Sequence, residues 1–599
     1  MDDQNKNLIL ASILSLLVII IWTVLFPAAE TDLPADTVTT TASAPAGDTA
    51  LTPGSAGGEV STETTAPAEP LPESAPRVAV ETPSVTGSIS LRGGRLDELA
   101  LNNYRESLDP GAEIVTLLNP TGSASPYYAL FGWAPGTGVN SDAVPGANTL
   151  WSVESGETLT PDSPVTLLWD NGQGLTFRRE ISVDAKYMFT IRQTVENTGD
   201  AAPVLAPYGI IARHGEPADL KNFFILHEGA VQMADGELNE IDYDDFEGAG
   251  NHTPLKVTTN GWTGFTDHYW MTTLIPRGET GFDLSTFQDP RRNIYQTTVK
   301  QPAITLEPGQ TAEATTQLFA GAKEWETIRN YQNKGGVDKF LDSIDWGWFF
   351  FLTKPIFALL HWLNQQIGNM GWSIIALTLI IKLVLLPLAY KSYVSMAKMK
   401  ELQPQMEKIK ERAGDDRQAL QKEMMALYKK EKVNPASGCL PILLQIPIFF
   451  SLYKVIFVTL ELRHAPWIGW IRDLSAPDPS SLYNLWGLLP WNAPEPGSLL
   501  ALIFIGILPL LLGISMWLQQ KLNPAPTDPT QKMVFAWMPW IFMFMLGSFA
   551  SGLVVYWIAN NTITFTQQYA IMRSQGYKPD VFGNIKSGFK RTRKTDDKK

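Results

Sequence analysis

Lys382 is the one charged side chain in an apolar run that is otherwise long enough to cross a bilayer. The run covers residues 371–390. A lysine at the centre of a membrane helix costs about 2.5–3.5 kcal/mol on insertion scales. Such a charge is retained where it faces water or a polar partner inside the protein. Lys382 is therefore the first candidate functional residue, and it predicts a site within the membrane.

The other polar residues of the apolar half limit the chemistry of this site. No Asp or Glu lies deep in a predicted span, which disfavours a proton relay or a cation-coupled transporter. Lys382 then has no evident ion-pair partner, so its charge calls for a hydrated pocket. The alternative is that Lys382 snorkels to the membrane surface, about 12 Å along the helix. The polar residues are Thr378, Gln445, Ser451, Asn560, Asn561, Thr562 and Gln567.

Composition divides the 599 residues into two halves. Residues 28–340 are polar and acidic and account for most of the net charge of −14, whereas residues 345–570 are rich in Leu, Ile, Trp, Phe and Met. The acidic balance disfavours nucleic acid as a partner of the first half, and DNA is not expected. The single cysteine, Cys439, excludes an intramolecular disulfide and is interpreted as a packing residue.

The first 83 residues predict an anchor and a tether. Residues 8–26 are almost entirely apolar, which predicts that residues 1–27 form an uncleaved membrane anchor. A cleavable signal is the alternative. Residues 28–83 consist mainly of Ala, Thr, Pro, Glu, Ser and Gly. Such a segment buries too little apolar surface to fold, so we expect a flexible linker.

Residues 84–340 predict an all-β sandwich. Short runs of β-forming residues at 85–91, 165–169 and 187–195 are separated by turn pairs such as Asn171-Gly172. A helical pattern follows at 323–331. His252 and His268 are isolated and lack metal-ligand spacing, so neither a metal nor a cofactor is expected. We interpret the domain as an interaction or scaffolding domain; a sugar-binding or epimerising enzyme is the alternative.

The second half predicts one interfacial helix and five spans. Residues 341–370 are aromatic with scattered polar residues, which is typical of an amphipathic helix at the interface, with a span as the alternative. The predicted spans within the core, 371–570, are 371–390, 437–459, 499–518, 534–550 and 553–570. Only Ser551-Gly552 separates the last two, which predicts a tight helical hairpin. The N-terminal anchor raises the number of spans to six.

Loop charge predicts the orientation of these spans. The loop 391–435 carries eleven Lys and Arg against seven acidic residues, whereas 460–498 carries only Arg463 and Arg472. The tail 571–599 is again basic. By the positive-inside rule, 391–435 and the C-terminus are cytoplasmic and the β domain lies outside. An even number of spans places the N-terminus inside as well.

The basic loop 391–435 predicts two antiparallel helices. Apolar residues recur at three- to four-residue spacing up to Ile409 and again from Leu420 to Tyr428, and Gly414-Asp415-Asp416 between them offers a turn and an N-cap. The methionines either join the two helices or form a soft surface for varied apolar segments. The candidate contact residues are Met396, Met399, Met406, Met424 and Met425.

Several long strings resemble the YidC–Oxa–Alb superfamily of membrane protein insertases, in the six-span form of Gram-negative bacteria. The resemblance covers nearly the whole chain, and strings of this length are highly specific. They lie at residues 87–91, 103–107, 393–404 (YVSMAKMKELQP), 414–417, 423–435, 438–449 (GCLPILLQIPIF) and 551–557.

The resemblance implies a β-supersandwich in the periplasm and a five-span core around a hydrophilic, cationic groove in the inner membrane. Lys382 matches the positive residue of the first core span, which is usually arginine. Lysine keeps the charge but lacks the planar guanidinium group that can form two parallel hydrogen bonds. Residues 477–497 form a longer loop than is usual in the family. The groove positions implied are Thr378, Lys382, Gln445, Phe449, Tyr556 and Trp557.

The function implied is insertion and folding of inner-membrane proteins, without a covalent step, alone or with the Sec translocon. Further partners implied are nascent membrane proteins, the signal recognition particle system and ribosomes. The basic tail at 590–594 and 598–599 could meet ribosomal RNA, with anionic lipid as the alternative. A solute transporter or channel is another alternative, disfavoured by the lack of deep carboxylates and detectable repeats.

Overall fold

The computed structural model describes residues 75–218, 220, 226–246, 254–414, 416–431, 433, 440–494, 498–523 and 529–577. The predicted N-terminal anchor, His252, Cys439 and the basic tail beyond residue 577 lie outside these ranges.

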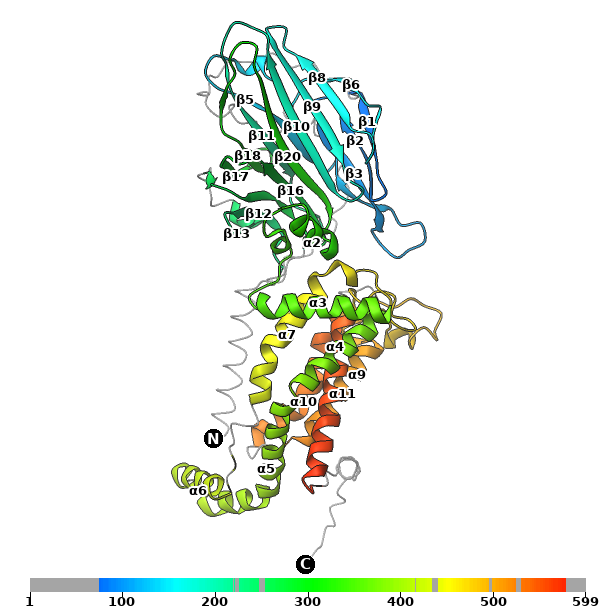
Figure 1. The fold of residues 1–599 in the computed structure, drawn as a ribbon. Coiled ribbons are helices and arrows are strands. Elements are labelled where there is room, and N and C mark those ends of the chain that lie inside the picture. The colour runs from blue at the N-terminus through cyan, green and yellow to red at the C-terminus, as the bar shows by residue number, and fades with distance from the viewer. Residues whose placement is uncertain are drawn as a thin grey trace, which may run out of the picture. The chain divides into compact units, whose positions relative to one another are not determined.

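The first part is a sandwich of two large, mainly antiparallel sheets (Figure 1). The nine-stranded sheet has the order β13-β12-β15-β16-β20-β10-β9-β8-β6. The other sheet has the order β14-β17-β18-β11-β5-β3-β2-β1-β7, with β19 beside β11 and β4 beside β3. Its strands are β1 (Arg77–Glu81), β2 (Val85–Ser90), β3 (Arg95–Arg105), β4 (Ile114–Leu118), β5 (Tyr127–Pro135), β7 (Thr158–Leu159), β11 (Val204–His214), β14 (Leu255–Val257), β17 (Phe282–Asp289), β18 (Ile294–Lys300) and β19 (Ile304–Thr305). The nine-stranded sheet holds β6 (Ser152–Ser155), β8 (Val165–Asp170), β9 (Leu175–Val183), β10 (Met188–Asn197), β12 (Gly229–Ala234), β13 (Glu237–Asp242), β15 (Gly261–Thr266), β16 (Trp270–Arg277) and β20 (Thr311–Ala322).

Period-two alternation explains why these strands form and which side they bury. In β9, every second residue is buried and the intervening ones are half-buried, so one face meets the opposite sheet. The predicted strands at 85–91, 165–169 and 187–195 are confirmed as β2, β8 and β10. Strand β1 lies inside the predicted linker 28–83, yet its residues pair with β2 as part of the sheet. The sandwich therefore begins before residue 84.

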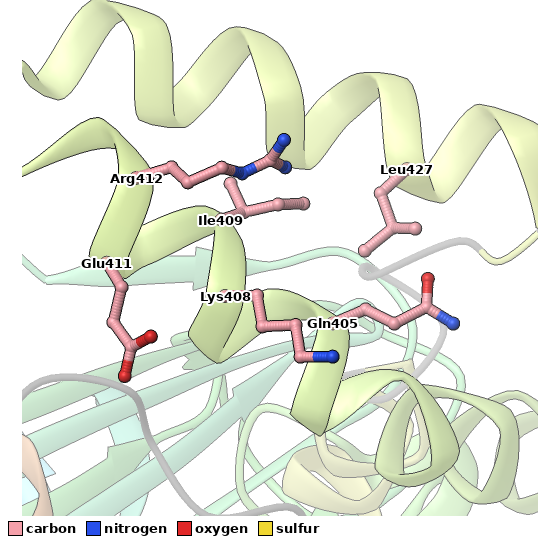
Figure 2. A pocket seen from close by; sticks show the side chains of 6 residues that line it. All are labelled: Gln405, Lys408, Ile409, Glu411, Arg412 and Leu427. Carbon is pink, nitrogen blue, oxygen red and sulfur yellow. The ribbon is translucent and has the colours of Figure 1, made fainter.

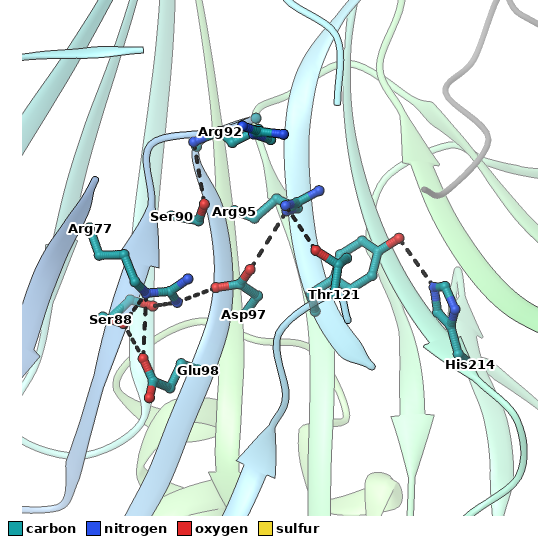
Figure 3. Close-up of polar contacts among 12 residues, drawn as sticks. Arg77, Ser88, Ser90, Arg92, Arg95, Asp97, Glu98, Thr121 and His214 are labelled. Atoms are coloured by element: carbon teal, nitrogen blue, oxygen red, sulfur yellow. Dashed lines mark hydrogen bonds and ion pairs between the residues drawn. The ribbon is translucent and has the colours of Figure 1, made fainter. Parts of the chain in front are cut away.

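Strands β1 to β3 also carry buried polar side chains (Figure 3). The Arg77 guanidinium donates to Asp97 and to Ser88, and Arg95 lies 3.7 Å from the Asp97 carboxylate. Burial raises the pKa of Asp97, and the two arginines oppose this effect. The charges inside this face are thus paired rather than isolated.

The second part is helical (Figure 1). Helix α11 packs on α4 and α9, α3 packs on α4 and α7, and α10 packs on α9. The helices are α2 (Trp325–Asn333), α3 (Phe350–Ile367), α4 (Met370–Val384), α5 (Leu386–Ala413), α6 (Arg417–Lys430), α7 (Leu440–Val458), α8 (Leu499–Ile503), α9 (Ile507–Leu522), α10 (Pro529–Met545) and α11 (Ser551–Ser574). Short 3-10 turns are η1 (Ser141–Ala143), η2 (Tyr243–Phe246), η3 (Phe340–Ser343), η5 (Leu460–Leu462), η6 (Leu482–Asn484) and η7 (Leu546–Ser548).

Helix α3 occupies the segment predicted to be amphipathic. Phe357, Leu360 and Leu363 are buried on one face. Large apolar side chains are exposed elsewhere on it, including Phe351 and Trp362. The helix therefore has a second apolar surface that no described residue covers.

Two predicted spans are interrupted. The run 371–390 is divided between α4 and α5, which meet at 69°. Pro387 explains this bend because it lacks an N–H and its ring conflicts with the preceding turn. The run 499–518 is divided between α8 and α9, with Gly506 as the residue before α9. Among the described helices, none alone is long and apolar enough to cross a membrane, whereas α4 and α5 together pass that test.

The predicted hairpin around Ser551-Gly552 is wrong. Both residues belong to the first turn of α11, where their N–H groups donate to the carbonyls of Ala476 and Leu474. Helix α10 packs on α9, and it is α9 that packs on α11. Helix α10 therefore packs mainly on the helix that precedes it, α9, rather than on the helix that follows it, α11.

Candidate functional site

The Lys382 side chain makes a polar contact between two helices. It lies in the last turn of α4, and its Nζ is 3.4 Å from the Oε1 of Gln445 on α7. The amide nitrogen of Gln445 donates to the Oδ1 of Asn560 on α11 at 2.8 Å. Three apolar helices thus meet through three polar side chains.

The polar chain continues into a fourth helix. Asn560 donates to Asn561 at 3.5 Å, and Asn561 donates to the hydroxyl of Ser515 on α9 at 3.1 Å. Asn560, Asn561 and Ser515 are buried. Buried amides require such partners, so this arrangement fixes the relative positions of α4, α7, α9 and α11.

Gln567 of α11 secures the end of α4. Its amide donates to the backbone carbonyl of Lys382 at 3.3 Å. The last four carbonyls of a helix have no partner within that helix. The contact therefore satisfies one of them at the position where α4 gives way to α5.

A small cavity surrounds the Lys382 side chain. It is lined by Thr378, Ile381, Lys382, Leu385, Gln445, Ile448, Tyr556 and Asn560, and its volume is about 10 Å³. A cavity of about this size holds one water. In the described part of the chain, no carboxylate lies within ion-pair distance of Lys382. The cavity is smaller than the expected hydrated pocket, and two of its lining side chains, Gln445 and Asn560, hydrogen-bond to each other.

The structure brings four of the six groove candidates together. Thr378, Lys382, Gln445 and Tyr556 line the cavity. Phe449 and Trp557 stack on each other with ring centroids 5.5 Å apart and do not line it. Sequence reasoning noted Asn560 and Asn561 only as polar residues in a span, and it missed Ser515. Their sole signal was polarity within an apolar run.

The hairpin methionines divide between packing and exposure. Met399, Met406 and Met424 belong to the apolar cluster that joins α5 to α6, whereas Met396 packs with Tyr393 and Ile571. Met425 is exposed. Asp416 caps α6 by accepting from the N–H groups of Gln418 and Ala419. The predicted antiparallel pair is confirmed, and most of the methionines hold it together.

An open pocket of about 670 Å³ lies on this pair (Figure 2). Lys408, Arg412 and Glu411 give it a mixed but mainly positive lining, with Gln405, Ile409 and Leu427 completing it. Arg412 also pairs with Glu423 of α6 at 3.1 Å. The hairpin thus presents basic groups beside apolar ones.

These features define a protein with a large β domain and a helical part in which apolar helices meet at a polar site. A family model described as the YidC periplasmic domain matches residues 77–359. A second, described as 60Kd inner membrane protein, matches residues 362–578. The chain belongs to the YidC family of inner-membrane protein insertases.

Curated relatives share the full length of the chain. The membrane protein insertase YidC of Roseobacter denitrificans is 65% identical, with 100% of each chain covered. The protein of the same name from Ruegeria pomeroyi is 66% identical with the same coverage. A solved structure of an active YidC insertase matches with 17% identity and a TM-score of 0.34, over 82% of this chain and 92% of that chain. Membrane protein insertion is not a catalytic reaction, which agrees with the expectation of a function without a covalent step.

Proposed function

We propose that Lys382 and its polar neighbours receive the hydrophilic terminal segment of a nascent membrane protein. The chain of contacts from Lys382 through Gln445 to Asn560 supports this role. It provides a cation and two amides between helices that are otherwise apolar. A substrate carboxylate or backbone carbonyl can exchange for these internal contacts.

The physical advantage is a shorter apolar barrier. A polar segment that crosses hydrocarbon loses its water, which costs several kcal/mol for each unsatisfied group. A polar site partway through the bilayer replaces some of that water. The apolar helix of the substrate then leaves into lipid, which is favoured by burial of its apolar surface. No bond is made or broken, so no nucleotide or cofactor is required.

The remaining parts have distinct proposed roles. Residues 1–27 anchor the chain, the part of 28–83 that precedes β1 tethers the β domain, 341–370 lie at the interface and 371–570 form the insertase core. Both termini are cytoplasmic, the protein spans the inner membrane six times, and the β domain is periplasmic. Met425 and the basic pocket of the hairpin meet arriving substrates before they reach the groove.

The proposed partners are nascent inner-membrane proteins and the surrounding lipid bilayer. The Sec translocon and the signal recognition particle system are proposed as further partners. The basic tail 571–599 is proposed to contact the ribosome by phosphate electrostatics.

The test uses pure protein in liposomes and a single-span substrate with a short acidic N-terminal tail. Protease protection of the tail is measured for the wild type, Lys382→Ala and Lys382→Arg. Lys391→Ala is the matched control, because Lys391 is an exposed lysine of the next helix.

The expected result is protection in the wild type, in Lys382→Arg and in Lys391→Ala, with a large loss in Lys382→Ala. Protection in Lys382→Ala equal to that in the wild type would contradict a role of Lys382 in insertion and favour a lysine that only snorkels to the membrane surface. No protection above that of empty liposomes would contradict insertion by this protein alone.

A further inference from the structure

The segment between α7 and α9 has an unusual surface composition. Between Leu474 and Pro494 the only charged residue is Asp478. The same stretch contains Tyr483, Trp486 and Trp491 among several leucines and prolines. We call residues 482–491 the aromatic tip. A loop without charge but rich in Trp, Tyr and Leu is not the composition of a solvated linker.

Asp478 fixes this segment to the start of α9. Its carboxylate accepts from the indole of Trp470 at 2.9 Å, from the N–H of Ser480 at 2.9 Å and from the N–H of Leu508 at 2.8 Å. At Gly506 a Cβ would approach a carboxylate oxygen of Asp478 to 2.6 Å, so only glycine allows this contact. The single charge of the segment is therefore used internally, and the tip is held in place.

The backbone of the aromatic tip satisfies most of its own hydrogen-bond donors. The N–H groups of residues 482, 483 and 485–489 donate to acceptors within the loop or at Ile505, and Pro490 has none to satisfy. The indole of Trp491 donates to the carbonyl of Tyr483 at 3.0 Å. Pairing of these donors lowers the cost of placing irregular backbone at the edge of an apolar medium.

Several apolar side chains of the aromatic tip are nevertheless exposed. Leu488 is 83% exposed, and Leu485, Trp486 and Trp491 are each more than 40% exposed. Leu485 and Trp486 have φ values of +47° and +58°, a strained region for residues other than glycine. Strain of this kind persists where the surroundings impose it, and here it directs two large apolar side chains away from the core.

We infer that the aromatic tip inserts into the lipid bilayer at the boundary between headgroups and acyl chains. It follows α7 and precedes α9, so it lies at the end of the helices whose apolar lengths the membrane covers. Trp and Tyr are enriched at this depth because an apolar ring and a polar edge suit it. The tip thereby anchors α7 and α9, which carry Gln445 and Ser515 of the polar chain. The inference takes from the proposed function only that α7 and α9 lie in the membrane.

The experiment uses the full-length protein in liposomes, with Cys439→Ser as the background. A single cysteine is introduced by Leu488→Cys and labelled with an environment-sensitive fluorophore. Quenching by spin-labelled lipids is compared with quenching by aqueous iodide. Leu511→Cys on the exposed side of α9 is the membrane control, and Asp162→Cys in an exposed turn of the sandwich is the aqueous control.

The expected result is several-fold stronger lipid quenching at residue 488 than at residue 162, with little quenching by iodide. Lipid quenching at residue 511 together with iodide quenching at residue 488 would overturn the inference and leave the membrane core intact. Protection of residue 488 from both quenchers would also overturn it, since a protein surface would then cover the tip. Failure of lipid quenching at residue 511 would reject the membrane placement itself.

Discussion

Lys323 makes the stability of the sandwich depend on pH in a direction opposite to the common expectation for lysine. It follows β20, is 4% exposed, and its Nζ donates to the Thr266 hydroxyl at 3.0 Å and to the Asp267 carbonyl at 2.6 Å. Burial lowers the pKa of Lys323 to about 8, and nearby carboxylates such as Asp267 oppose the effect only in part. An unfolded lysine titrates at about 10.4.

The direction of this pH dependence follows from whether the folded or the unfolded state keeps the proton on Lys323. Between pH 8 and about 10.4 the unfolded chain keeps the Lys323 proton while the folded chain releases it, so stability rises with pH in this window. Below pH 8 both states are charged and the contribution is constant. A pKa difference of about 2.4 corresponds to about 3 kcal/mol, of which most is realised by pH 10.

The assay compares the thermal unfolding of the sandwich in the full-length protein at pH 7.5 and pH 10. Lys323→Met is expected to remove the gain in stability with pH, so that the wild type gains several degrees in Tm relative to the variant. Lys300→Met, an exposed lysine at the end of β18, serves as the control and should keep the wild-type slope. An unchanged slope in Lys323→Met would refute the reasoning.

Three further outcomes follow from individual contacts. Lys454→Met leaves the half-buried Asp345 carboxylate with backbone partners only, and we expect a loss of about 3 kcal/mol by chemical denaturation, largely recovered by adding Asp345→Asn. Asp416→Ala removes the cap of α6 at a cost of about 1 kcal/mol, so hydrogen exchange should accelerate at the start of α6 and not in the middle of α5. Gln445→Leu breaks the link from Lys382 to Asn560 and should lower insertion of an acidic-tailed substrate, whereas Ile446→Ala, at an exposed neighbouring position, should not.

The sequence predicted those parts of the fold that depend on local periodicity. Strands such as β8 and β10 alternate buried and less buried residues, and the turn at Asn171-Gly172 lies between β8 and β9 as expected. The bend between α4 and α5 had a local signal in Pro387, which the length of the apolar run concealed. The packing of α10 on α9 rather than on α11 had no local signal, because both helices are its neighbours in the chain and only tertiary packing distinguishes them.

The candidate site was predictable to a similar degree. Lys382 stands out because a charge in an apolar run is costly, and Gln445 and Asn560 stand out as amides in such runs. Their contact joins residues 115 positions apart, which only the packing of α7 on α11 creates. The role of Ser515 as the end of the polar chain and the small volume of the cavity likewise result from tertiary packing.

The central claim is that the polar segment of a substrate enters the groove beside Lys382. A photoreactive amino acid replaces Ile381, which lines the cavity without belonging to the polar chain, in one variant and Leu379, an exposed residue of α4 outside the cavity, in another. Each variant is presented with an arrested single-span substrate, and crosslinks to its acidic tail are mapped. The account predicts strong tail crosslinks from position 381 and few from position 379. Tail crosslinks that are absent at position 381, or equal at the two positions, would contradict it.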